Sequence, residues 1–215
     1  MDNKIIYRKL QETDRDSIED MLYTSFILED PLEVSLGIEC PREARILVEP
    51  LVGWALADGV SVVAEHVPSR ELAGVCLNTV DSEVKRSIPV PAGDPDCTKM
   101  KVVLDFLDDM RDGVDLRKQF SMTKVVDIRI INVLHKYAGK GIGRALVEES
   151  LLLAKDHGCV TACAEATGVF SQKLFQCLGF TTVNEVFYSN YIKDGMLVFN
   201  NTGIHRSCRL VAKTL

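Results

Sequence analysis

Apolar residues recur along the first half of the chain with the spacings of short strands and amphipathic helices. Alternating or continuous apolar positions predict strands over 5–10, 60–65 and 72–79. Apolar positions three or four residues apart predict helices over 13–26, 42–57 and 98–111. Pro31 disfavours helix at the residue before it, so Glu29, Asp30 and Pro31 should form an extended turn. Pro50 lies within the second helical pattern and should kink or split that helix. Residues 87–96 include three prolines and are expected to form a loop.

The second half of the chain alternates between the two kinds of pattern. Strands are predicted over 124–134, 159–164, 181–187 and 208–212, and helices over 141–157 and 170–178, whereas 189–205 has no readable period. The strand over 124–134 is the strongest because it is rich in β-branched residues. The alternation indicates a mixed α/β fold. A chain of 215 residues is enough for one sizeable core, so we expect a single domain over 1–215.

Composition and charge exclude several classes of protein. Hydrophobic residues make up 47% and charged residues 26%, which argues against disorder. The net charge of −6 makes a general nucleic-acid binder improbable. Seven scattered cysteines without a CxxC pair or clustered histidines argue against a disulfide scaffold or a metal site. We find no apolar leader and no 18-residue apolar run, so we expect a cytoplasmic protein without a membrane or nucleic-acid partner.

A glycine-rich turn at 137–146, YAGKGIGRAL, joins the strongest strand directly to a helix. Three alternate glycines lie in it: Gly139, Gly141 and Gly143. Three basic residues accompany them with no acid between: Lys136, Lys140 and Arg144. Glycines let the backbone approach a ligand, and a helix start offers unpaired N–H groups, so the turn suits a pyrophosphate. The alternative is a purely structural turn between strand and helix.

Two common phosphate-binding motifs do not fit this turn. A P-loop needs Ser or Thr after its Gly-Lys pair, but Gly141 follows Lys140. A dinucleotide fingerprint needs GxGxxG, and the last position of its two possible registers is Arg144 or Leu146. The turn therefore belongs to another class of anion site.

The turn resembles the acetyl-CoA pyrophosphate loop of the GNAT acyltransferase superfamily, and 174–180, LFQCLGF, resembles that family's later helix ending in Leu-Gly-Phe. Ala138 departs from the family pattern, where Arg or Gln is usual. The resemblance implies a mixed, mostly antiparallel twisted sheet flanked by helices, with acetyl-CoA in a splay between two parallel strands. It also implies that the backbone of Ile131 and Val133 pairs with the pantetheine arm and that the glycines and basic residues of the turn hold the cofactor.

The N-terminal region is similar to the insect arylalkylamine N-acetyltransferases. The likeness lies in 18–22, IEDML, in 26–32, FILEDPL, and in 36–40, LGIEC, and it excludes 82–120 and 189–205. In that group the second acid before Pro-Leu removes a proton from the amine. Here that position is Asp30, with Glu29 beside it. Asp is one methylene shorter than the usual Glu, so a bridging water or Glu29 could replace direct contact, and the two acids could instead only shape the turn.

The leaving thiolate needs a proton donor. Many relatives use a tyrosine where this chain has Phe175, and the insect group has two hydroxyls that correspond to Thr167 and Ser171. We expect both hydroxyls on one side of a helical turn, with Ser171 also near the cofactor. The alternative role for Ser171 is a helix cap. Four isolated histidines without metal spacing are expected at the surface or in the core: His66, His135, His157 and His205.

The resemblance therefore implies an acetyl-CoA-dependent N-acetyltransferase that acts on a small, arylalkylamine-like primary amine by direct transfer in a ternary complex. We expect a monomer with no metal. Two alternatives remain open. One is an enzyme for polyamines, hydrazine-like amines or peptide amines, which the shorter acid favours. The other is a non-catalytic acyl-CoA-binding module.

Overall fold

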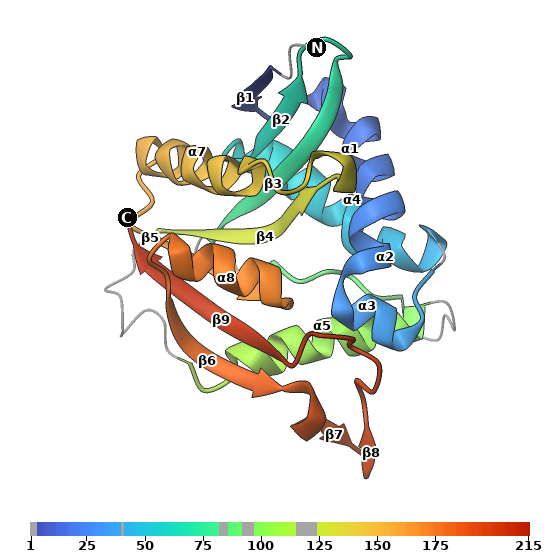
Figure 1. The fold of residues 1–215 in the computed structure, drawn as a ribbon. Coiled ribbons are helices and arrows are strands. Elements are labelled where there is room, and N and C mark those ends of the chain that lie inside the picture. Colours follow the sequence, from blue (N-terminus) through green and yellow to red (C-terminus); the bar gives the residue numbers. More distant parts are fainter. Residues whose placement is uncertain (1–3, 40, 82–85, 92–96, 115–123) are drawn as a thin grey trace.

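The computed structural model describes residues 4–39, 41–81, 86–91, 97–114 and 124–215. Seven strands of the described chain form one sheet, in the order β1 (Ile5–Lys9), β2 (Val62–His66), β3 (Glu71–Asp81), β4 (Val125–Val133), β5 (Thr161–Ala166), β9 (Ser207–Thr214) and β6 (Thr181–Phe187). The β4–β5 pair is parallel and the others are antiparallel (Figure 1). The predicted mixed, mostly antiparallel sheet is confirmed.

Helices cover both faces of this sheet. One face packs against α1 (Arg15–Met21), α4 (Pro41–Asp58) and α5 (Thr98–Arg111), and the other against α7 (Ile142–Asp156) and α8 (Val169–Cys177) (Figure 1). Successive side chains of a strand point to opposite faces of the sheet, so the strands contribute to two core clusters, one under each layer of helices. Val62 and Ala64 join the cluster under α7, whereas Val63 joins the cluster under α4.

The first predicted helix is longer and less regular than its pattern indicates. After α1, a π-helical turn at Leu22–Phe26 leads into α2 (Ile27–Glu29), and α3 (Pro31–Leu36) follows. Asp30 is extended, with φ −69° and ψ 131°, as the following proline requires. Glu29 ends a helix and Pro31 begins one, so the expected extended turn is confined to Asp30. A π-helical turn widens the helix locally. Here it places the hydroxyl of Ser25 where it donates a hydrogen bond to the side chain of Asn132 on β4.

Pro50 does not split the second helix. The helix α4 runs unbroken from Pro41 to Asp58 with Pro50 inside it. Buried residues on both sides of the proline, including Val48 and Leu51, pack into one core cluster. This packing outweighs the hydrogen bond that proline removes, so the expectation of a split helix is wrong.

The structure agrees closely with most of the remaining expectations. The helix over 98–111 is α5, with bounds that match, and the strand predictions agree to within a few residues. Residues 87–91 form neither helix nor strand, and the rest of the expected loop, 92–96, lies outside the described residues. The segment without a readable period contains a 3₁₀ turn at Tyr188–Asn190 and a small hairpin of β7 (Ile192–Lys193) and β8 (Met196–Leu197). A further 3₁₀ turn lies at Glu12–Asp14 and another at His135–Tyr137.

The parallel strands separate part-way along their length. Register pairing between β4 and β5 stops at Ile128 and Ala164, although β4 continues to Val133. At the same level the pairing of β4 with β3 shifts by one residue, so that Arg129 is the extra residue of a bulge. A bulge bends its strand and redirects its side chains. The backbone of β4 beyond Ile128 therefore faces open space where a neighbouring strand would lie.

Candidate active site

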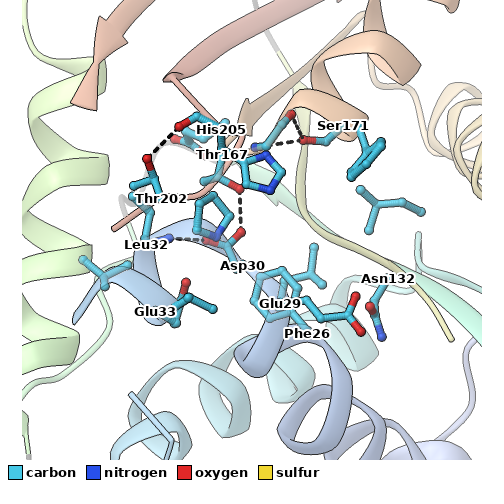
Figure 2. A pocket seen from close by; sticks show the side chains of 18 of the residues that line it. Phe26, Glu29, Asp30, Leu32, Glu33, Asn132, Thr167, Ser171, Thr202 and His205 are labelled. Atoms are coloured by element: carbon cyan, nitrogen blue, oxygen red, sulfur yellow. Dashed lines mark hydrogen bonds between the residues drawn. The ribbon is translucent and has the colours of Figure 1, made fainter. Parts of the chain in front are cut away.

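A cavity of about 560 Å³ opens at this separation. Its walls come from the α2–α3 junction, the divergent part of β4, the end of β5, the start of α8, and the 201–205 segment, with leucine and valine side chains of α4 and α5 at one end. Figure 2 shows that the polar side chains of these elements converge on one region. Segments from both halves of the chain therefore build a single site.

Asp30 is held in the wall of the cavity by two hydrogen bonds. One carboxylate oxygen accepts from the N–H of Leu32 at 3.0 Å and caps α3. The other accepts from the hydroxyl of Thr167 at 2.5 Å (Figure 2). The side chain is buried, with 9% exposed. These contacts fix the direction of the carboxylate and leave each oxygen with capacity for one more donor.

Glu29 also lines the cavity, but it is exposed. No hydrogen bond or ion pair holds its carboxylate within the part of the chain that the structure describes. Asn132 of β4 also lines the cavity, and its buried amide nitrogen likewise has no partner among the described residues. The predicted acid pair is therefore divided into one buried carboxylate held by hydrogen bonds and one exposed carboxylate without them.

Glu33 is a third acid of this wall. It lies one turn into α3, lines the cavity, and is 2% exposed. Burial raises the pKa of its carboxyl well above the usual value, and the negative charge of Asp30 beside it raises that pKa further. Sequence reasoning missed this residue, because an acid in the first turn of a helix is an ordinary feature of a helix start.

The two predicted hydroxyls are both at the cavity, but not on one helical turn. Thr167 precedes Gly168, the residue that caps the start of α8, so it lies outside the helix. Its carbonyl accepts a hydrogen bond from the hydroxyl of Tyr188 at 2.6 Å, which fixes it for its contact with Asp30. Ser171 donates to the carbonyl of Gly168 at 2.9 Å. The helix-cap geometry proposed as the alternative for Ser171 is thus present, while its side chain still lines the cavity.

His205, expected at the surface or in the core, is half-buried beside the polar residues of the site. It lines the cavity, and its Nδ1 accepts from the N–H of Val169 at 3.0 Å (Figure 2). The proton of a neutral ring therefore lies on Nε2. The side chain lies in the 189–205 region, which has no readable period, so no sequence signal placed it. The remaining three histidines do not line this cavity.

A network of four charged residues lies under the point where the strands separate. Arg111 of α5 pairs with Asp127 at 2.8 Å and with Glu165, and Arg129 pairs with Asp127 at 2.8 Å. Burial alone would raise the pKa of the Asp127 carboxyl, but the two guanidinium groups outweigh it and hold that pKa below the usual value. The network joins α5 to β4 and β5, and two of its members, Arg129 and Glu165, line the cavity.

The glycine-rich turn ends at the first residue of α7. Gly139 and Gly141 have φ of +73° and +77°, and a side chain at either would meet nothing within 4 Å. These glycines are therefore required by backbone conformation and not by packing. No side chain caps α7. The N–H groups of residues 142–144 have no partner among the described residues and are available to an anion. Gly143 differs, because it has helical φ and its Cβ would contact Val133 and Leu174 at 3.7 Å.

The basic residues of this turn are less isolated than the sequence indicates. Lys136 pairs with Glu71 of β3 at 2.6 Å, and Arg144 pairs with Glu148 at 2.9 Å. Lys140 lies over the ring of Tyr137, 5.3 Å from its centroid. Glu71 lies on another strand and Glu148 in the next turn of α7. Both are outside the stretch from Lys136 to Arg144, so the sequence pattern of the turn did not indicate them. Exposed ion pairs of this kind contribute little free energy, so these basic side chains can leave their acid partners to bind a phosphate.

Residues 110–180, which contain β4, the glycine turn, α7, β5 and α8, match the acetyltransferase (GNAT) family. The chain carries a GNAT acetyltransferase domain. The crystal structure of arylalkylamine N-acetyltransferase 2 from Aedes aegypti is similar over 99% of both chains, with 26% identity and a TM-score of 0.89. The polyamine N-acetyltransferase of Drosophila melanogaster, described as forming N-acetylagmatine, aligns over 99% of this chain and 100% of its own, with 19% identity and a TM-score of 0.81. The NatC complex bound to Gag peptide and CoA is a more distant match, with 14% identity over 99% of both chains and a TM-score of 0.55.

In this GNAT domain the separated part of β4 runs from the acid-lined cavity towards the start of α7. The separated part of β4 carries Ile131, which lines the cavity, and Val133, which contacts the start of α7. The uncapped helix start lies just beyond. Unpaired N–H groups therefore lie near one end of this part of β4, and the acid-lined cavity lies at the other. Within the described chain we find no group of three or more potential metal ligands and no helix long and apolar enough to cross a membrane.

Proposed function

We propose that this GNAT domain transfers the acetyl group of acetyl-CoA to a small primary amine by direct attack in a ternary complex. One observation carries the proposal. The cavity at the separation of β4 and β5 brings the carboxylates of the α2–α3 junction next to the strand edge that suits a thioester. An alkylamine is protonated at neutral pH, so the site must both attract an ammonium ion and remove its proton.

Each group in the site has a role that its geometry supports. Asp30, held by Thr167, accepts a proton from the amine, directly or through a water. Glu29 at the rim attracts the cation. The backbone of β4 at Ile131 and Val133 orients the acyl carbonyl and stabilises its developing negative charge. Ser171 lies near the departing sulfur, although its hydroxyl already donates to Gly168.

The turn between β4 and α7 is proposed to hold the pyrophosphate. Its backbone N–H groups and the positive end of the α7 dipole supply attraction without a dedicated side chain. Lys140 and the two paired cations, Lys136 and Arg144, add long-range attraction. The glycines at 139 and 141 leave space for the ligand to contact the backbone.

Turnover of an amine panel at fixed acetyl-CoA tests this proposal. We expect release of CoA with at least one of three classes, namely arylalkylamines, aliphatic polyamines and peptide N-termini. Acetyl-CoA should also raise the melting temperature, because a ligand that binds only the folded state stabilises it. Binding of acetyl-CoA without any turnover would instead support the non-catalytic acyl-CoA module. If acetyl-CoA neither binds nor is turned over, both the proposed enzyme and the non-catalytic acyl-CoA module are refuted.

A further inference from the structure

Glu33 is a buried acid that has no cationic partner among the described residues and lies in hydrogen-bond contact with a second acid, Asp30. Its Oε2 has no hydrogen-bond partner among the described residues, and the side chain is 2% exposed. Buried polar groups are nearly always satisfied, so an orphan carboxyl oxygen in a cavity wall indicates a ligand group that satisfies it. The wall that it shares with Asp30 is shown in Figure 2.

Helix capping does not account for this residue. Asp30 is the N-cap of α3 and Glu33 lies three residues later, which is the spacing of a capping box. In that motif the glutamate would accept from the N–H of the N-cap residue. Here the Asp30 N–H already donates to the carbonyl of Phe26 at 2.9 Å, at the end of the preceding helix. The carboxyl of Glu33 therefore lines the cavity without making the capping-box bond.

Two acids in one buried wall set a condition on the charge of the ligand. Burial and the negative charge of Asp30 both raise the pKa of Glu33, so a ligand that ionises Glu33 must bring a positive charge beyond the one that pairs with Asp30. The other acid of the inner wall, Glu165, is already paired with Arg111. Asp30 and Glu33 are thus the buried acids of this wall that have no cationic side chain as a partner among the described residues.

We infer that Glu33 is a specificity-determining residue that binds the second cationic nitrogen of an acceptor, while Asp30 serves the nitrogen that is acetylated. The acceptor class is an alkylamine with two cationic nitrogens, such as a diamine, a polyamine or a guanidinoalkylamine. Apolar side chains of α4 and α5, including Leu47 and Val103, line the same cavity and suit the methylene chain between the nitrogens. This inference rests on the proposed function and names its substrate class.

The test compares two acceptors of equal length, diaminobutane and butylamine, in the wild type and in Glu33→Gln. Glutamine keeps the shape of the side chain and removes its charge. We expect wild type to favour diaminobutane in kcat/KM. We expect Glu33→Gln to lower the ratio of the two values by about tenfold or more, because a buried charge-assisted hydrogen bond is lost. In the control Glu49→Gln, the carboxylate is exposed and lies outside the cavity lining, so the ratio should change by less than about threefold.

Equal losses for both amines, with a shifted pH profile, would show that Glu33 only adjusts the basicity of Asp30 and would overturn the inference. So would an unchanged ratio. If butylamine is turned over while the ratio does not respond, the inference fails and the proposed function stands. If neither amine is turned over and acetyl-CoA does not bind, the proposed function fails.

A binding measurement on the wild type keeps the inference testable without turnover. Calorimetry with CoA present, in two buffers of different ionisation enthalpy, counts the protons released on binding. Diaminobutane should release about one proton more than butylamine, because its second nitrogen ionises Glu33. Glu33→Gln should abolish that difference. Equal proton release for the two amines, or no binding of diaminobutane, would overturn the inference.

Discussion

At the scale of single residues, the site depends on two acids that have different surroundings. Asp30 is buried and bonded at both oxygens, whereas Glu29 is exposed and unbonded within the described chain. A fixed carboxylate can receive a proton in a defined direction, and a free one can attract cations from solvent. The proposed base is therefore Asp30.

We predict that Asp30→Asn lowers kcat/KM by about 10²–10⁴-fold, the usual contribution of a general base, whereas Glu29→Gln changes it by only a few-fold. Asparagine is as good an N-cap as aspartate, so the melting temperature should stay close to that of the wild type. Steady-state kinetics across pH provide the measurement. Higher pH should partly rescue Asp30→Asn, because solvent then supplies free amine. Wild-type pH profiles and rates within about twofold in both variants would remove these acids from the mechanism.

Glu33 gives a second residue-scale prediction, on stability and pH. Its pKa is raised in the folded protein, so the folded state holds a proton that the unfolded state loses above the usual glutamate value of 4.5. The free energy of unfolding is therefore higher below that pH and falls as the pH rises towards the pKa of Glu33 in the folded protein. Glu33→Gln should therefore be more stable than wild type at about pH 7 and nearly equal to it at about pH 4. Denaturant unfolding at the two pH values measures this, and a constant difference would contradict it.

At the scale of elements, the turn between β4 and α7 contains glycines of two kinds. Gly139 and Gly141 need positive φ, so any side chain there strains the backbone whether or not a ligand binds. Gly143 lies inside the helix, where a Cβ has room beside Val133 and Leu174. A substitution at Gly143 therefore separates ligand approach from folding better than one at Gly141.

We predict that Gly143→Ala raises the KM for acetyl-CoA by about tenfold while the fold is unchanged or stabilised, by up to about 1 kcal/mol. The added methyl group would lie 3.7 Å from Val133, on the strand proposed to bind the pantetheine arm. Gly53→Ala is the matched control, because Gly53 lies within α4 and its Cβ would meet nothing within 4 Å. Kinetics and thermal unfolding of both variants decide the matter. An unchanged KM in Gly143→Ala would make the turn a purely structural one.

The same elements mark what the sequence could and could not predict. The apolar period of α5 and the β-branched run of β4 placed those elements well, because local pattern and tertiary burial agree there. The π turn at Leu22–Phe26 and the unbroken helix through Pro50 were missed, because packing overrides local preference at both. Thr167 and Ser171 were found as residues, but their geometry was wrong, since α8 begins after Gly168 and not before it.

At the scale of the whole molecule, the site joins segments that are far apart in the sequence. Asp30 meets Thr167 across 137 positions, and Arg111 meets Glu165 across 54. No local pattern encodes such contacts, which is why Glu33, His205 and the charge network were absent from the sequence prediction. The resemblance to a family supplied the position of Asp30, but not the partners that orient it.

The charge network yields a prediction about the stability of the molecule as a whole. Arg111 ties α5 to two strands, and its acid partners Asp127 and Glu165 are 7% and 8% exposed at their side chains. Arg111→Met should lower the free energy of unfolding by about 3 kcal/mol, because the buried Glu165 loses its ion pair and Asp127 keeps only Arg129. Arg45→Met is the control. It breaks an exposed pair with Glu49 and should cost less than about 1 kcal/mol. Equal effects in urea unfolding would show that the network is not structurally important.

The acid-lined wall also bears on how a turnover ends. Acetylation converts an ammonium ion into a neutral amide, so the attraction that brings the amine to Asp30 disappears when the bond forms. A product of one nitrogen then has little reason to stay and leaves the cavity to the next substrate. A product that keeps a second cation remains attracted to Glu33 after the chemistry is complete. The acid that selects the acceptor would thus also set how long the product stays, and selectivity and product inhibition would rise together.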